Sequence, residues 1–435
     1  MSLLTYQKDL FTSAGRWLRS KPDGRVLWPT FACLILVILV GAILPSGFAV
    51  SDRGSAAGGE DERSTQEALV ARARTAYSAE IERALPDLDA VTLETLTENL
   101  TQLAESNMPD KRAALVSFAA GDRDAALGTL AAIVTAQRNN GDETAVFETL
   151  SETGALTFLF APSASYRAYT EALKINSDDP AARYHLGLLF QQSRETENAR
   201  SQFKSIAEDP ALEGTAWQAA AEGNLGILAI QAGNMALAEY HVLKSLQYNE
   251  RLNRPKALGL QHANLGVIGI SRGNAEAANS NLKKALAIFE GLGEEANIAR
   301  TLGNLGLVAQ SQQKYEAAEG YLTQSAQLSR KLGDARGLAM QLGVLARTKR
   351  LQGDLTQAEN YYKQSITLND ELGNELVIGA QYASLGGIEY DRQNIVAACS
   401  YWRESVKFFE RSGSAEGTSQ VQALLDQASC TTDPG

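Results

Sequence analysis

One stretch of the chain recurs at a fixed interval and decides the fold. Residues 224–239 read NLGILAIQAGNMALAE, residues 264–279 read NLGVIGISRGNAEAAN, and residues 304–319 read NLGLVAQSQQKYEAAE. The Leu-Gly pair returns at Leu385-Gly386, and Leu345-Ala346 fills the remaining place, so that the step is 40 residues each time. A fixed period of this length is typical of a solenoid built from stacked supersecondary units.

Each unit is predicted to be a pair of antiparallel helices. In residues 260–292, the apolar residues after the Gly273-Asn274 break recur every three to four positions, which indicates an amphipathic second helix. Gly266 in the first run and Ala278 in the second suit a crossing at which two helices come close. A strand in the first run, as in leucine-rich repeats, is the alternative, but the run lacks the alternation of a strand.

This pattern resembles the tetratricopeptide repeat (TPR) family, which combines Leu-Gly with aromatic residues and alanines at set positions. The best single match is residues 172–203, and the later units resemble the longer repeats of kinesin light chain. The resemblance covers residues 147–413, with a degenerate unit at 107–146. It implies an all-α, right-handed superhelical solenoid.

The N-terminal part predicts a single transmembrane helix at residues 26–50, which carry no charge and are long enough to cross a hydrocarbon core of about 30 Å. Residues 1–25 are an expected cytoplasmic tail with more cations than anions and an interfacial amphipathic helix. The positive-inside rule places the repeats on the extracytoplasmic side, in the periplasm for an inner-membrane protein. A cleaved signal peptide is the alternative, and it leaves the repeats on the same side.

The remaining segments are expected to link and cap the repeats. Residues 51–63 contain Ser, Gly, Ala and charged residues, as in a flexible linker. Residues 64–106 fit an N-terminal helical cap, with a dimerising coiled coil as the alternative. Residues 414–435 fit a C-terminal capping helix and tail.

Composition and motifs predict an interaction protein rather than an enzyme. The net charge is −11 and no basic stripe is present, which argues against nucleic-acid binding and favours a basic partner. The three histidines, at positions 185, 241 and 262, have no metal-ligand spacing, and no phosphate loop or nucleophile elbow is present. No cofactor or metal is therefore expected.

The TPR resemblance implies that the first helix of each repeat lines a concave groove. The residue before Leu-Gly is Asn224, Asn264 and Asn304 in three successive repeats. Because an amide both donates and accepts, such a row can bind an extended peptide backbone, or it can bond a neighbouring helix and stabilise stacking. The same offset gives the other groove candidates: Tyr184, His185, Arg300, Gln310, Arg347, Arg350, Ser384 and Tyr390.

The sequence therefore predicts a membrane-anchored TPR scaffold or adaptor that binds an extended or basic segment of a partner protein. The alternative is a structural envelope component that self-associates without a peptide ligand. Cys399 and Cys430 lie at similar distances from the turn expected at Gly413, so they are candidates for a disulfide. The alternative is a buried thiol at Cys399 and a frayed tail at Cys430.

Overall fold

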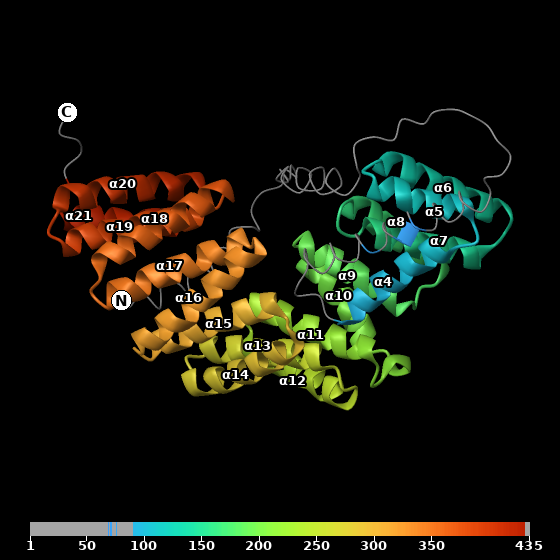
Figure 1. Ribbon diagram of the computed structural model, residues 1–435, viewed down its shortest axis with the longest axis horizontal. Helices are drawn as coiled ribbons and strands as arrows, with labels where there is room; N and C mark the ends of the chain where they lie inside the picture. The colour runs from blue at the N-terminus through green and yellow to red at the C-terminus, as the bar shows by residue number, and fades with distance from the viewer. Residues whose placement is uncertain (1–67, 69, 72–74, 76–89, 431–435) are drawn as a thin grey trace. The chain divides into compact units, whose positions relative to one another are not determined.

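The computed structural model describes residues 90–430 and, before them, Ala68, Val70, Ala71 and Thr75. The described part of the chain contains 18 α-helices and no strand, so the fold is all-helical and TPR-like (Figure 1). None of the described helices is both long and apolar enough to span a bilayer. The tail at 1–25, the anchor at 26–50, the linker at 51–63 and the first part of the expected cap lie outside the described residues.

The helices follow one another with short connections. The first group consists of α4 (Ala90–Glu105), α5 (Pro109–Ala119), α6 (Arg123–Asn139), α7 (Glu143–Thr157), α8 (Pro162–Ile175), α9 (Pro180–Gln192) and α10 (Thr196–Ala207), followed by the 3₁₀ helix η1 (Pro210–Leu212). The second group consists of α11 (Ala216–Gln231), α12 (Met235–Arg251), α13 (Pro255–Ser271) and α14 (Ala275–Leu292). The third group consists of α15 (Glu295–Ser311), α16 (Tyr315–Leu332), α17 (Ala335–Leu351), α18 (Leu355–Glu371), α19 (Glu375–Asp391), α20 (Ile395–Arg411) and α21 (Ala415–Gln427).

The described residues divide into two compact units. Residues 90–228 and 243–257 form the N-terminal unit, and residues 229–242 and 258–430 form the C-terminal unit. In the C-terminal unit, α15, α17, α19 and α21 begin 40 residues apart, as the repeat requires. In the N-terminal unit, the expected boundary between residues 146 and 147 falls inside α7, which packs on α8 as one pair, as α5 does on α6.

Short polar residues and glycines fix the ends of the helices. At the predicted break, Gly273 has φ of 71°, and the Asn274 side chain accepts a hydrogen bond of 3.1 Å from the Ala277 N–H at the start of α14. Gly293 ends the same helix in the left-handed conformation, as Gly333 ends α16. The turn chemistry therefore repeats together with the helices.

Glycines in the first helices make room for the second helices, although not quite as the sequence predicted. A Cβ on Gly266 would lie 2.5 Å from the Leu282 side chain, whereas the close approach to the backbone of Ala278 is made by Gly269. The same accommodation explains the buried Phe289 and Phe409, whose rings lie against Gly259 and Gly379 respectively. A glycine thus stands where the second helix carries a bulky side chain.

A hydrogen bond that the sequence analysis does not predict joins the two helices within each of the last three repeats. The hydroxyls of Ser325, Ser365 and Ser405 are buried, and each donates at 2.6 Å to the carbonyl 26 residues earlier, in Ala299, Ala339 and Gly379. The signal was present, because these serines are themselves 40 residues apart. A buried hydroxyl needs a partner, and the carbonyl of the first helix supplies it.

Candidate functional site

The first helices of the C-terminal unit present a polar, half-exposed side to solvent. We call this side the first-helix face and define it by seven residues on α15, α17 and α19: Arg300, Asn304, Met340, Arg347, Arg350, Ser384 and Tyr390. None of the seven is fully buried, and Met340 is 50% exposed. Because residues 40 apart occupy equivalent places in successive repeats, the face continues from one helix to the next.

Arg300 provides a partly desolvated cation on α15. Its Nη2 donates to the Asn297 side-chain oxygen at 3.1 Å. Burial lowers the pKa of the guanidinium to about 10, and the Asp334 carboxylate opposes that shift. The side chain therefore remains a cation at neutral pH, with much of its hydration replaced by protein.

Arg347 and Arg350 place two more cations one helical turn apart on α17. Burial lowers the pKa of Arg347, opposed by the phenols of Tyr362 and Tyr315. Arg350 donates from Nε at 3.0 Å and from Nη2 at 2.7 Å to Oδ2 of Asp391 on α19. This ion pair holds the Arg350 side chain across the α17–α19 boundary.

Tyr362 shows that residues of three helices meet at this place. Its side chain comes from α18 and is 5% exposed. Burial raises the pKa of its phenol, while the neighbouring Ser384 hydroxyl, Arg350 and Arg347 oppose the rise. Two of the predicted arginines and the predicted serine are thus gathered around one buried phenol.

Small residues lie beside the arginines. Gly343 on α17 and Ala383 and Gly387 on α19 are all half-exposed. Gly387 has no side chain to displace the Arg350 guanidinium, which would come within 2.8 Å of a Cβ at that position. The Arg350 guanidinium therefore lies against the surface of α19 at Gly387.

Four of the predicted groove residues do not line an accessible surface. Tyr184 and His185 are 0% exposed, while Asn224 and Gln310 are 8% and 6% exposed. The Gln310 amide is used inside the protein, where Nε2 donates to the Thr348 hydroxyl at 2.8 Å. The offset from Leu-Gly gives the correct helix, but the neighbouring repeat decides whether the side chain is covered.

Tyr184 and His185 were wrongly expected in the groove because aromatic residues from neighbouring helices cover them. The His185 ring stacks on Tyr169 at a centroid distance of 5.1 Å and meets Phe158 edge-on. Burial lowers the pKa of His185 to about 3, so its ring is neutral at physiological pH. A hydrogen bond with the Ala181 backbone opposes this shift only in part.

The asparagine row divides between the two expected roles. The Asn224 amide donates to the Tyr184 hydroxyl of the preceding repeat and to the Ala220 carbonyl, as the stacking interpretation requires. Asn264 is half-exposed, with a 3.4 Å hydrogen bond to Gln261 on its own helix. Asn304 is also half-exposed, and its side chain forms no hydrogen bond to another described residue. Asn264 and Asn304, the later members of the row, therefore remain half-exposed, whereas Asn224 is buried.

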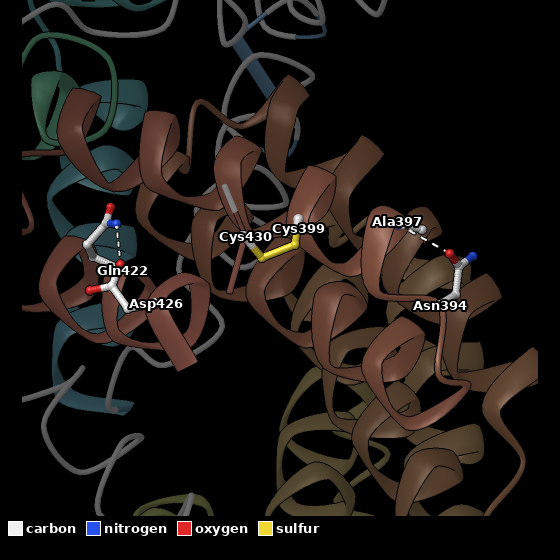
Figure 2. Close-up of a disulfide and its surroundings, with 6 residues drawn as sticks. All are labelled: Asn394, Ala397, Cys399, Gln422, Asp426 and Cys430. Carbon is white, nitrogen blue, oxygen red and sulfur yellow. Dashed lines mark hydrogen bonds between the residues drawn. A yellow bond between two sulfur atoms is a disulfide. The ribbon is translucent and has the colours of Figure 1, made fainter. Parts of the chain in front are cut away.

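Cys399 and Cys430 are joined by a disulfide, shown in Figure 2, with their Cα atoms 5.7 Å apart. Cys399 lies in the second turn of α20 and is 6% exposed, whereas Cys430 is half-buried just beyond α21. The bond therefore fastens the end of the last helix to the start of the helix before it. No group of three or more His, Cys, Asp or Glu side chains able to hold a metal occurs in the part of the chain that the structure describes.

Comparison with known proteins agrees with the helical repeat. A family model described as tetratricopeptide repeat matches residues 297–371, the region of α15 to α18. No curated protein matches the sequence. The matched segment contains all three charged residues of the first-helix face, which are Arg300, Arg347 and Arg350.

Solved structures with similar folds include a signal-transduction ATPase with a tetratricopeptide repeat sensor from Pyrococcus horikoshii. That match has 12% identity and a TM-score of 0.51, and covers 86% of this chain and 63% of the other. A Rap protein complexed with competence and sporulation factor matches at 14% identity, with 78% and 97% coverage and a TM-score of 0.47. A putative kinesin light chain with TPR-like repeats from Podospora anserina matches at 14% identity, with 45% and 98% coverage and a TM-score of 0.37. The chain is thus similar to TPR proteins in residues 297–371 and in fold.

Proposed function

We propose that this chain is a membrane-anchored TPR scaffold that binds an extended segment of a partner protein on the extracytoplasmic side of a membrane. The observation that carries the proposal is the first-helix face, where arginines, small residues and half-exposed polar groups occur together. TPR-like folds generally act as non-catalytic protein-interaction scaffolds, and the similar Rap structure holds a bound factor. An extended segment suits a face that repeats along successive helices.

The charge on the first-helix face favours a partner segment that carries carboxylates. The net charge of −11 led us to expect a basic segment. This face instead carries Arg300, Arg347 and Arg350, and the first two are already partly desolvated. A planar guanidinium recognises a carboxylate through two parallel hydrogen bonds, and it loses less hydration if it is already partly buried.

Self-association remains the alternative function, and it requires a contiguous exposed apolar patch. Among the residues that the structure describes, the most exposed large apolar side chain, Val396, is 83% exposed at the start of α20. It follows a turn that contains the exposed, charged Arg392, so it adjoins a polar edge. The first-helix face is likewise dominated by polar side chains, which supports a peptide ligand over a second copy.

The proposed location rests on the sequence and is supported by the cysteines. The uncharged residues 26–50 are long enough to anchor the chain, and the flanking charges favour a cytoplasmic N-terminus. The Cys399–Cys430 disulfide supports an oxidising compartment for the repeats, because such bonds are rare in the reducing cytosol.

Site-specific photo-crosslinking tests this function. A photoreactive amino acid at Met340 should crosslink a partner protein in intact cells, whereas the same group at the exposed Gln364 on α18 should not. Arg347→Gln should lower the affinity for the crosslinked partner by about fivefold to a hundredfold, the usual result of removing a charged hydrogen-bond donor. Arg330→Gln, which changes an exposed arginine on α16, is the matched control and should leave binding unchanged.

Two outcomes would contradict the peptide proposal. If Met340 crosslinks only to a second copy of this chain, the self-associating function is correct. If Arg347→Gln and Arg330→Gln have equal effects, the first-helix face does not bind the partner.

A further inference from the structure

The last helix of the C-terminal unit is held through one side only. Val421 and Leu425 of α21 are buried against α20 and α19, and Gly417 lies against the Phe409 ring. The opposite side of the helix carries the exposed Gln422, which donates to Asp426 at 3.2 Å (Figure 2). A helix of 13 residues with so few buried side chains has little packing energy of its own.

Covalent connections hold both ends of this helix. At its start, the turn through Gly413 joins it to α20, and the Ser414 hydroxyl accepts from the Gly417 N–H at 3.2 Å. Just beyond its end, Cys430 donates its backbone N–H to the Leu425 carbonyl at 2.9 Å, and its sulfur is bonded to Cys399. The disulfide is thus the tether at the free end of the α20–α21 hairpin.

The side chains beneath α21 are apolar. Trp402 and Phe409 of α20 are 3% and 0% exposed, and both belong to the cluster that contains Val421, Leu425 and Cys399. If α21 separated from α20, this cluster would lose one wall, and the apolar side of α20 would meet water. Local opening of this kind occurs in elements that have few buried contacts.

We propose that the Cys399–Cys430 disulfide is a redox switch that controls whether α21 remains docked on α20. This regulation is separate from peptide binding by the first-helix face and does not depend on it. In the oxidised protein, α21 covers the apolar side of α20. In the reduced protein, α21 opens locally while the preceding repeats stay folded.

A dithiol is the reductant that this switch requires. Its thiolate attacks Sγ of Cys430, which is the more exposed of the two residues, and the Cys399 sulfur leaves as a thiolate and is protonated. The mixed disulfide joins the first sulfur of the reductant to Cys430. The second thiol of the reductant then attacks that first sulfur, and Cys430 is released as a thiol. Two electrons and two protons pass to the protein, and the dithiol becomes a disulfide.

Hydrogen–deuterium exchange of the full chain, with and without dithiothreitol, tests the proposal. Mass spectrometry first establishes whether the bond is present and then reduced. Amide exchange in residues 415–427 should become at least about tenfold faster on reduction, as expected for local opening, while exchange in α15 to α18 should not change. Trp402 fluorescence should shift to longer wavelength, and the variant Trp402→Phe should remove that shift.

Cys430→Ser removes the disulfide without any dithiothreitol and leaves the buried Cys399 unchanged. It therefore distinguishes the effect of losing the bond from other effects of the reagent. This variant should exchange in residues 415–427 as fast as the reduced protein, and dithiothreitol should have no further effect on it. Equal protection of residues 415–427 in the oxidised and reduced proteins would overturn the proposal. Faster exchange throughout the C-terminal unit would also overturn it, because the bond would then stabilise the whole unit rather than one helix.

Discussion

The two units use the same helix-pair plan but fill the space between helices differently. In the N-terminal unit, Gly154 and Gly187 lie against the rings of Tyr169 and Phe203. In the C-terminal unit, the equivalent glycines, Gly266 and Gly306, lie against the leucines at 282 and 322. The same small residue therefore accommodates a rigid ring in the N-terminal unit and a leucine in two repeats of the C-terminal unit, whereas in the last repeat Gly386 again lies against a ring, that of Trp402.

The two units also differ in how deeply they bury one lysine–glutamate ion pair each. The Nζ of Lys111 lies 2.6 Å from Glu152 in the N-terminal unit, and both side chains are about 5% exposed. The Lys349–Glu319 pair of the C-terminal unit has the same 2.6 Å separation, but the Glu319 side chain is 34% exposed. Both side chains of the Lys111–Glu152 pair are thus buried, whereas the carboxylate of the Lys349–Glu319 pair stays in contact with water.

The largest expected effect comes from breaking the buried pair. Lys111→Met should lower the free energy of unfolding of the N-terminal unit by about 3–5 kcal/mol, because it leaves the Glu152 carboxylate buried without a cation. Lys349→Met should cost about 1 kcal/mol or less, because water can solvate Glu319. Urea unfolding followed by Trp217 fluorescence for the N-terminal unit, and by Trp402 for the C-terminal unit, measures both costs. Equal costs would show that burial does not distinguish the two pairs.

The second effect depends on pH and arises from His185. Its pKa is about 3 in the folded protein and about 6.5 when it is free. The unfolded chain therefore binds a proton that the folded chain does not, and stability falls as pH drops below about 6.5, by about 1.4 kcal/mol per pH unit. At pH 5 the loss is about 2 kcal/mol, and His185→Phe should remove it from the Trp217 transition. His262→Gln, which changes a half-exposed histidine in the C-terminal unit, is the control and should leave the Trp217 transition of the N-terminal unit unchanged.

The smallest effect sharpens the comparison of glycines. A Cβ at Gly187 would lie 2.7 Å from the Phe203 ring, and a Cβ at Gly306 would lie 2.6 Å from Leu322. Gly187→Ala should lower the free energy of unfolding by about 1–3 kcal/mol, because the Phe203 ring is held between Tyr184 and its own helix. Gly306→Ala should cost less than Gly187→Ala, since a leucine side chain can adjust more than a ring and alanine favours the helix by about 1 kcal/mol. Thermal unfolding of both variants measures the difference, and a larger cost at Gly306 would contradict this account.

The sequence predicted those parts of the fold that depend on local pattern. The 40-residue step, the turn at Gly273-Asn274 and the helix end at Gly293 follow from spacing, helix capping and glycine conformation. The exposure of individual side chains was less predictable, because it depends on residues in other repeats. His185 and Asn304 both precede Leu-Gly, yet His185 is covered by Tyr169 and Phe158 while Asn304 is half-exposed. The cysteine pairing stayed open in the sequence for the same reason, since it depends on how α21 lies on α20.

The serine hydrogen bonds have a consequence for how such a chain can change its length during evolution. Each bond closes within 26 residues, so a duplication or deletion of one 40-residue unit keeps every serine with its own carbonyl acceptor. Bonds between repeats, such as Gln310 to Thr348 and Gln381 to Ser365, depend instead on which unit comes next. Recombination at the 40-residue period therefore preserves the fold of each helix pair. Only the contacts between neighbouring helix pairs change and need further substitutions.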